Sequence, residues 1–323
     1  MSAAARRFAL VIDQRGTLLE TGARGTLVVR HADGRVERVG LGALGAGVLH
    51  GDVALSTGVL RAMAEHDIAF AASPREGAIG VAGFVRWPRR QVRLRHQQHL
   101  VHADPVRRLA MARVVVQAKL AAIAAFVARE AWGCEAAVTR SMRAAHEARD
   151  LDTLRGVEGA ATAAHFAVLR SAYGEHGPFA FDGRSRQPPR DAPNALMSLG
   201  YALAGAEAAR VALRCGLDVQ LGFLHEMHRD RESLALDLVE PARAVVDEWV
   251  LELLQRRRQL PSARFRATAE GGMVLTQEGR ADFYPRWFSE GRPRALEAIR
   301  SLAAEVVTQL RRRVDRRESP RPW

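Results

Sequence analysis

One histidine and three carboxylates are the side chains of this sequence whose types and spacing could do chemistry. They are Glu158, His225, Asp237 and Glu240. A histidine with two or three carboxylates offers mostly oxygen ligands, which suit Mg²⁺ or Mn²⁺ better than Zn²⁺. A hard cation of this kind polarises a phosphate oxygen and stabilises the attacking or leaving oxygen. The set therefore predicts metal-dependent phosphodiester chemistry.

Asp237 and Glu240 lie three residues apart in a mostly apolar segment, LALDLVE. On a helix, this spacing places both carboxylates on one face. The surrounding leucines predict that Asp237 is buried, and a buried carboxylate is costly without a partner. A divalent cation shared with His225 would supply that partner, and so would the guanidinium of Arg229 or Arg231. The pattern leaves these two alternatives open.

Glu158 stands in the middle of a predicted helix, within the sequence GVEG. The flanking Gly156 and Gly159 each cost about 1 kcal/mol of helix stability relative to alanine. Such small residues let another backbone or a phosphate approach the carboxylate. A single helical glutamate is more often a solvated side chain, so Glu158 gains meaning only together with the other three residues.

Several well-known catalytic motifs are not found. The sequence shows no G-x-x-x-x-G-K-[ST], no G-x-S-x-G and no H-E-x-x-H, and no G-x-G-x-x-G is expected after a strand. A nucleotide-driven motor, a Rossmann oxidoreductase and a zincin are therefore not expected. The two cysteines, Cys134 and Cys215, lack C-x-x-C spacing and are interpreted as small buried apolar residues.

The composition is that of a folded and strongly basic protein. The chain has 323 residues, of which 48% are hydrophobic and 26% charged, and its formal net charge is +12. Only one of the 48 basic residues is a lysine, Lys119. A GC-rich genome explains arginine in place of lysine but not the excess of positive charge. That excess favours a polyanionic partner, most often nucleic acid.

The N-terminal part of the chain favours β-structure. Five strands are predicted, at residues 7–13, 25–31, 35–39, 68–72 and 79–84. Between the third and the fourth strand, Ser56 is placed to cap a short helix that runs to Glu65.

The rest of the chain is predicted to be helical after a basic segment. Residues 86–95 contain five arginines and a proline, and they are interpreted as an inter-domain linker. Helices are expected from Asp104-Pro105 onward and over 151–173, 194–214, 233–258 and 293–317. The expected fold class is α+β, with a small N-terminal β-rich domain (1–86), a basic linker (87–96) and a larger all-helical domain (97–323).

The sequence gives no sign of membrane attachment. No stretch of about 18 apolar residues runs without a charge, so no spanning helix is expected. The apolar run near the N-terminus is short and stops at Asp13, which argues against a signal peptide. No long basic amphipathic helix with bulky apolar residues points to a membrane surface. A cytoplasmic protein is therefore expected.

Three blocks of the sequence resemble the CRISPR-associated endonuclease and integrase family, the catalytic subunit of the spacer-acquisition complex. The blocks are 154–166 (LRGVEGAATAAHF), 187–203 (QPPRDAPNALMSLGYAL) and 216–240 (GLDVQLGFLHEMHRDRESLALDLVE). Weaker agreement is found at 51–56 and 272–280, so the resemblance covers nearly the whole chain. It is specific because the three blocks occur together, in order and at the expected spacing.

The resemblance implies roles for individual residues. The family's metal-binding glutamate and histidine fall on Glu158 and His225, and its acidic pair falls on Asp237 and Glu240. Glu158, His225 and Glu240 would be the direct ligands of Mg²⁺ or Mn²⁺, with Asp237 beside them as a fourth catalytic residue. The tyrosine of the N-A-L-x-S-x-G-Y block falls on Tyr201, which is expected near the DNA end.

For three further sets of side chains, the resemblance gives weaker support for a role in the site. The family often has a tyrosine seven residues after the catalytic glutamate, and this sequence has His165 there, which puts any role of that side chain in doubt. His165 and His228 are therefore left out of the predicted site. Arg93 and Arg95 of the basic linker are predicted to contact DNA phosphates, provided that the helical domain folds back beside the linker.

The function implied by the resemblance is a metal-dependent DNA endonuclease and integrase of prokaryotic adaptive immunity. A captured double-stranded fragment would present its 3′-hydroxyl to a CRISPR array and become a new spacer. The same site would cut branched or single-stranded DNA with water as the nucleophile. The resemblance also implies a homodimer, formed largely through the β domain and bridged by a small second adaptation protein. The rival interpretation is a non-catalytic basic nucleic-acid-binding protein, which explains the charge but not the acidic and histidine set.

Overall fold

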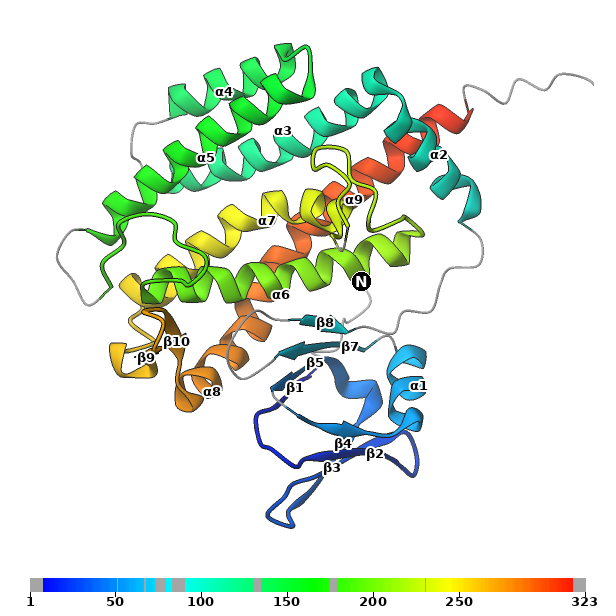
Figure 1. Ribbon diagram of the computed structural model, residues 1–323, viewed down its shortest axis with the longest axis vertical. Helices are drawn as coiled ribbons and strands as arrows, with labels where there is room; N and C mark the ends of the chain where they lie inside the picture. Colours follow the sequence, from blue (N-terminus) through cyan, green and yellow to red (C-terminus); the bar gives the residue numbers. More distant parts are fainter. Residues whose placement is uncertain are drawn as a thin grey trace, which may run out of the picture. The chain divides into compact units, whose positions relative to one another are not determined.

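The chain folds into two compact units, seen here in a computed structural model. The structure describes residues 8–50, 52–66, 68–73, 80–82, 91–130, 135–174, 179–229 and 231–315. One unit comprises Met1–Trp87 with Arg280–Ser289, and the other comprises Pro88–Gly279 with Glu290–Trp323. Strands dominate the first unit and helices the second (Figure 1). The predicted α+β class, with strands before a mainly helical part, is confirmed.

The described residues of the first unit form two four-stranded sheets. In one sheet, β1 (Phe8–Ile12), β5 (Leu44–His50) and β7 (Ala69–Ser73) run parallel, and β8 (Gly80–Ala82) is antiparallel to β7. In the other, β2 (Leu18–Gly22), β3 (Thr26–Arg30) and β4 (Val36–Gly40) form an antiparallel meander, and β6 (Ala54–Leu55) runs parallel to β2. The strands β2, β5 and β6 were not among the predicted elements.

Helix α1 (Thr57–Glu65) packs on these sheets. The Ser56 hydroxyl accepts the Val59 N–H at 3.4 Å, so the predicted cap is confirmed. Aliphatic side chains from both sheets and from α1 form one core, with Leu19, Leu44 and Val59 among its most buried members.

Residues Arg280–Ser289 belong to the first unit although they come late in the chain. They include most of helix α8 (Gln277–Arg286). Arg280 Nη2 lies 2.7 Å from Asp13 Oδ2, and Tyr284 Oη lies 2.7 Å from His50 Nε2. The predicted division at 1–86, 87–96 and 97–323 lacks this return, because a linear pattern gives no sign of a contact between residues 234 positions apart.

Helix α7 (Ser233–Leu251) forms the centre of the second unit (Figure 1). It packs against α3 (Pro105–Glu130), α6 (Ala192–Cys215) and α9 (Arg292–Asp315), and most of its residues are buried on every side. A helix that is apolar around most of its circumference belongs inside a domain. Three more helices contact α3: α2 (Val92–Ala103), α4 (Glu135–Glu147) and α5 (Leu151–Tyr173).

Four predicted helices agree closely with the structure. The helix predicted over 151–173 is α5, and that predicted over 194–214 is α6, which Gly216 ends in the left-handed conformation at φ 79°. The helix predicted over 293–317 is α9 (Arg292–Asp315). The one predicted over 233–258 comprises α7 followed by a π turn, Glu252–Arg256.

The second unit differs from the prediction in several places, and helix α4 was also not among the predicted elements. A short antiparallel pair, β9 (Phe265–Ala267) and β10 (Met273–Leu275), adds strands to the expected helices. Helix α2 begins inside the predicted linker, at Val92, and its buried face includes Gln97 and Gln98. Buried glutamines break the apolar periodicity that marks a helix in a sequence, so this helix was missed. Residues 87–90 of the predicted linker lie outside the described residues.

A glycine-rich turn in the first unit corrects the expectation that no G-x-G-x-x-G follows a strand. Residues 40–45 read GLGALG, which matches the letters of G-x-G-x-x-G directly after a strand. A 3-10 turn, Leu41–Ala43, and strand β5 follow the strand, and no helix N-terminus is formed there. A dinucleotide phosphate needs that N-terminus, so the turn is not a Rossmann fingerprint.

Helix α3 corrects the expectation that no segment could span a membrane. Residues Pro105–Arg129 are long and apolar enough to do so by length and composition, with a mean hydropathy of 1.7. In the 18-residue apolar window of this helix, 50% is buried inside the structure, as is usual for a core helix. The sequence rule demanded a run without charges, whereas this helix includes Lys119, whose burial is explained by the site below.

Candidate metal and nucleic-acid site

Helix α5 places Glu158 on its buried side. Leu154 and Ala161 are buried at helical spacing, and Glu158 lies between them on the same face. Its Oε1 accepts a hydrogen bond from the Thr162 hydroxyl at 2.9 Å and contacts the ammonium of Lys119. The glutamate is therefore not a solvated surface residue.

The glycines beside Glu158 border open space. A Cβ added at Gly156 or Gly159 would meet no described atom within 4 Å. No other described backbone therefore packs against this stretch of α5. The sequence suggested that the glycines make room for a backbone or for a phosphate, and this observation favours the phosphate.

Helix α7 supplies the acidic pair, and both carboxylates are buried as predicted. Asp237 is 0% exposed and Glu240 is 4% exposed. The Asp237 carboxylate accepts the backbone N–H groups of Phe223, Leu224 and His225, and its Oδ1 lies 2.7 Å from His225 Nδ1. The groups that make these bonds all belong to the turn that contains the histidine, and backbone N–H groups were not among the partners suggested by the sequence.

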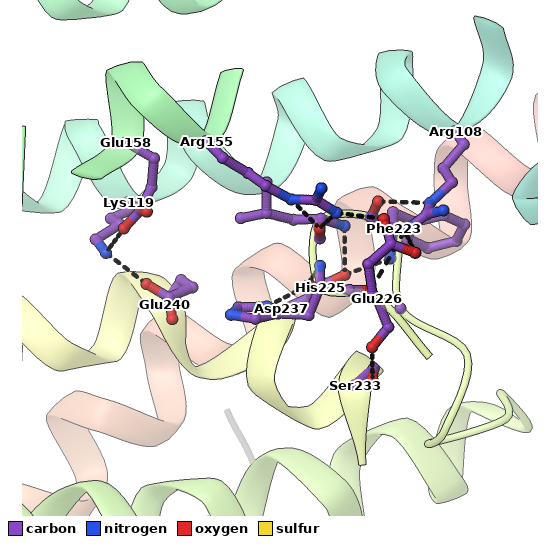
Figure 2. A network of polar contacts seen from close by, with 12 residues as sticks. Arg108, Lys119, Arg155, Glu158, Phe223, His225, Glu226, Ser233, Asp237 and Glu240 are labelled. Carbon is purple, nitrogen blue, oxygen red and sulfur yellow. Dashed lines mark hydrogen bonds and ion pairs between the residues drawn. The ribbon is translucent and has the colours of Figure 1, made fainter. Parts of the chain in front are cut away.

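The turn that presents His225 is held by arginines from two helices (Figure 2). Arg155 of α5 donates to the Leu224 carbonyl at 2.6 Å and pairs with Glu226 at 2.6 Å. Arg108 of α3 donates to the Phe223 carbonyl at 3.0 Å and also pairs with Glu226, at 3.0 Å. These bonds and those of the Asp237 carboxylate fix the imidazole from both sides of the turn.

Glu240 is an ionised carboxylate with one oxygen available. Its Oε1 accepts from Arg243 Nε at 2.9 Å. Its Oε2 lies 2.6 Å from Lys119 Nζ, but the approach lacks hydrogen-bond geometry and this buried oxygen has no other described partner. Burial raises the pKa of Glu240, but the charges of Arg243 and Lys119 outweigh it and lower the pKa to about 2.

The donor set fits a hard divalent cation. Glu158 and Glu240 come from different helices and converge on one positive charge, and Glu240 Oε2 is a buried acceptor without a hydrogen bond. His225 is held through Nδ1, so its Nε2 is the ring nitrogen that would bind a metal. As they stand, no three acidic, histidine or cysteine side chains in the described part of the chain converge on a single metal position. The ammonium of Lys119 lies between the two glutamates instead (Figure 2).

Tyr201 lies in a polar cluster that is joined to Glu240. Its hydroxyl donates to Asp247, and the guanidinium carbons of Arg184 and Arg243 lie 5.2 and 4.9 Å from its ring centroid. Burial and the nearby Asp247 carboxylate raise the pKa of Tyr201 well above its usual range, so the phenol stays neutral. Arg243 contacts both Tyr201 and Glu240, which places the tyrosine beside the acidic set.

The two histidines left out of the predicted site have clear partners. His165 is buried, its Nε2 lies 2.9 Å from Asp247 Oδ2, and its ring meets Phe126 edge-on at 5.1 Å. His228 is exposed, with its Nδ1 2.7 Å from the carbonyl of Arg229. His165 and Tyr201 therefore both contact the carboxylate of Asp247.

Arg93 and Arg95 lie in the first turns of α2, not in an extended linker. Arg93 is exposed, whereas Arg95 is half-buried and its Nε donates to the carbonyl of Gly216 at 3.3 Å. Arg95 thus has a structural contact in addition to its predicted role with DNA.

Sequence reasoning missed several residues of this region besides Arg108 and Arg155, namely Lys119, Arg184, Arg243 and Asp247. A usable signal existed for Lys119, because it is the chain's one lysine and it interrupts an apolar helix. Asp247 is similarly an acidic residue in the apolar stretch AVVDEWV. The arginines had no such signal in a sequence that contains so many.

Residues 10–288 match the model of the protein family described as CRISPR associated protein Cas1. CRISPR-associated endonuclease Cas1 2 of Rhodospirillum rubrum is 35% identical over 287 residues, which cover 83% of this chain and 82% of that protein. CRISPR-associated endonuclease Cas1 3 of Thermus thermophilus is 38% identical over 178 residues, which cover 55% of this chain and 53% of that protein. The match therefore spans about half the length of the second relative.

Solved structures share the fold at low sequence identity. A Cas1 protein from Thermotoga maritima superposes with a TM-score of 0.82 at 23% identity, covering 94% of this chain and 97% of that one. A casposase bound to an integration product gives 0.79 at 19% identity, with 93% and 91% covered. A chain of a Cas6-RT-Cas1–Cas2 complex gives 0.74 at 17% identity, with 97% and 36% covered.

Proposed function

The chain belongs to the CRISPR-associated Cas1 family, and from this premise we propose that it is a divalent-metal-dependent DNA endonuclease and integrase. Its reaction is the insertion of captured DNA fragments as new spacers into a CRISPR array. One observation supports this proposal above all others. Glu158 and Glu240, from helices α5 and α7, converge on a single cation beside the His225–Asp237 pair.

The residues divide the chemical work as follows. Glu158, Glu240 and His225 hold Mg²⁺ or Mn²⁺, and Asp237 orients His225. When bound, such an ion polarises a phosphate oxygen and stabilises the charge that develops as the 3′-hydroxyl of the fragment attacks. Tyr201, kept neutral by burial and by Asp247, presents its ring and hydroxyl beside the DNA end. With water in place of the 3′-hydroxyl, the same site cuts DNA.

The proposed partners are DNA, a second copy of this chain and a small second adaptation protein. The net charge of +12 supports binding to a duplex fragment and to the array. Among structures of the same fold are a casposase with an integration product and a Cas1–Cas2 assembly, which supports the same kinds of partner here. Two strands must be joined at each insertion, which is why a homodimer with two sites is proposed, in the cytoplasm where the array is found.

Substitution of single ligands tests the proposal. Glu158→Gln, His225→Ala and Glu240→Gln should each lower Mn²⁺-dependent cleavage and strand transfer by at least roughly a thousandfold, because the metal supplies most of the electrostatic stabilisation. DNA affinity in a gel-shift assay should stay within a few-fold, since it depends mainly on arginine. Wild-type activity should disappear with a chelator.

The matched control is Glu232→Gln, which removes an exposed carboxylate at the start of the same helix, α7. It should leave cleavage unchanged. If the three ligand variants fold, bind DNA and still cut at the wild-type rate, the site is misassigned and the non-catalytic nucleic-acid-binding interpretation is correct.

A further inference from the structure

We propose that Lys119 is the resident cation of the acidic site. In the metal-free protein its ammonium holds Glu158 and Glu240 together, and it competes with the divalent ion for them. This inference rests on the metal site proposed above and adds to it a residue that sets how tightly the ion binds.

The geometry places one ammonium between carboxylates of two helices (Figure 2). Lys119 extends from α3 and contacts Glu158 of α5, and its Nζ lies 2.6 Å from Glu240 Oε2 of α7. The side chains of Lys119 and Glu240 are 7% and 5% exposed. The ammonium thus reaches both carboxylates that the metal would use.

Electrostatics explain why a cation is needed there at all times. Two ionised carboxylates that share a buried site repel each other, and neither is stable without a positive partner. The metal would remove this repulsion, but the protein must fold before it holds a metal. Lys119 supplies the positive charge before the metal binds. A divalent ion that binds later has to overcome the attraction between Lys119 and the two carboxylates.

A lysine is better suited than an arginine to a position where a divalent ion must displace the side chain. Its ammonium is a point charge on a flexible stem, whereas the arginine fork locks onto carboxylates through two bonds. Arg129 shows the second behaviour with Glu248, through hydrogen bonds of 2.6 and 2.5 Å between the same two helices, α3 and α7. Lys119 reaches Glu240 through a single ion-pair contact of 2.6 Å to Oε2, without a fork of two bonds. Every other basic residue of the chain is an arginine, and this position has the one lysine.

The test compares Lys119→Met with wild type, with and without Mn²⁺. In chelator the variant should lose roughly 5–15 °C in melting temperature, because the buried Glu240 and the half-buried Glu158 lose their shared cation. Calorimetric titration should show Mn²⁺ binding at least about tenfold more tightly, because no ammonium has to be displaced. The rise in melting temperature on adding Mn²⁺ should be larger in the variant than in wild type.

Arg129→Met is the matched control, since it removes a cation from the same α3–α7 pair of helices, although at a more exposed position. It should lower the melting temperature by the same amount with and without Mn²⁺ and leave the Mn²⁺ affinity unchanged. If Lys119→Met does not fold in chelator, rescue of its folding by Mn²⁺ supports the proposal. Lys119→Arg gives a second measure, because its fork should hold both carboxylates and weaken Mn²⁺ binding at least about tenfold.

Unchanged or weaker Mn²⁺ binding by Lys119→Met, with a wild-type response to the metal, would overturn the inference. Wild-type affinity in Lys119→Arg would do the same. These results differ from a failure of the proposed metal site itself. In that case Mn²⁺ would not stabilise wild type at all, and Glu158→Gln would bind the ion no worse.

Discussion

Asp237 and Glu240 lie within one turn of the same buried helix, yet their surroundings give them different tasks. Asp237 is saturated by three backbone N–H groups and the His225 ring. Glu240 has an arginine on one oxygen and only the ammonium of Lys119 beside the other. The first carboxylate is therefore committed to holding the histidine, and the second is available to a metal.

This division predicts the effect of Asp237→Asn. An amide has one acceptor oxygen for the N–H groups of Phe223, Leu224 and His225, so buried donors lose their partners. The melting temperature should fall by roughly 2–10 °C. Mn²⁺ affinity should fall by roughly 10–100-fold, because the ring of His225 loses its orienting partner. Thermal unfolding and calorimetric titration measure the two effects.

Asp150→Asn is the control for the loss of one carboxylate charge. Asp150 caps α5 by accepting the Thr153 N–H at 2.7 Å, and asparagine caps helices equally well. This variant should keep both the melting temperature and the Mn²⁺ affinity. If Asp237→Asn does the same, the assigned role of Asp237 is wrong.

At the scale of elements, the turn at residues 222–226 depends on side chains from several helices. Helix α7 holds its N–H groups through Asp237, and helices α3 and α5 hold its carbonyls through Arg108 and Arg155. Gly222 fits there because a Cβ would come within 2.8 Å of the Ser233 backbone. The histidine is thus positioned on an irregular segment by the rigid helices around it.

Adjacent arginines of α3 offer a sharp test of this arrangement. Arg108 holds the turn, whereas Arg107 makes a 3.0 Å pair with Asp104 at the start of its own helix. Arg108→Met should speed hydrogen exchange at the amides of 223–226 and lower Mn²⁺ affinity several-fold. Arg107→Met, with the same loss of charge, should change neither. Equal exchange in the two variants would show that Arg108 does not position the turn.

The same elements show what the sequence could and could not predict. Helices α5 and α6 have aspartate N-caps and glycine C-caps, and together with α7 and α9 they were predicted nearly to their ends. Helix α2 was missed because glutamines occupy part of its buried face. The candidate site residues Glu158, His225, Asp237 and Glu240 were proposed from pattern and resemblance, but most partners of Asp237 are backbone N–H groups, which every residue type except proline supplies. Only three-dimensional contacts identify Lys119 as the cation between two helices.

At the scale of the whole molecule, the positive charge of the arginines serves two purposes, internal contacts and the attraction of phosphates. Most arginines near the site neutralise carboxylates or hold carbonyls, as Arg155 and Arg243 do. The remaining excess gives the chain its net charge of +12. The proposed function needs this excess for phosphate contacts, so DNA affinity should depend strongly on salt concentration.

Arg93 and Arg95 on α2 test that dependence: Arg93 is exposed, and Arg95 donates to the carbonyl of Gly216. Each phosphate contact releases counterions and adds about 0.9 to the slope of log K against log salt. Arg93→Ala should therefore lower the slope by about one unit. Arg95→Ala should lower both the slope and the melting temperature.

Arg140→Ala is the control, because it removes the same charge from an exposed position on α4. Filter binding over a range of salt concentrations measures the slope for each variant. If only the total charge of the molecule matters, Arg93→Ala and Arg140→Ala will weaken binding slightly and equally, and neither will change the slope by a full unit. That result would contradict a direct contact between the start of α2 and DNA. A loss of one unit in Arg93→Ala alone would place the path of the phosphate backbone along this helix.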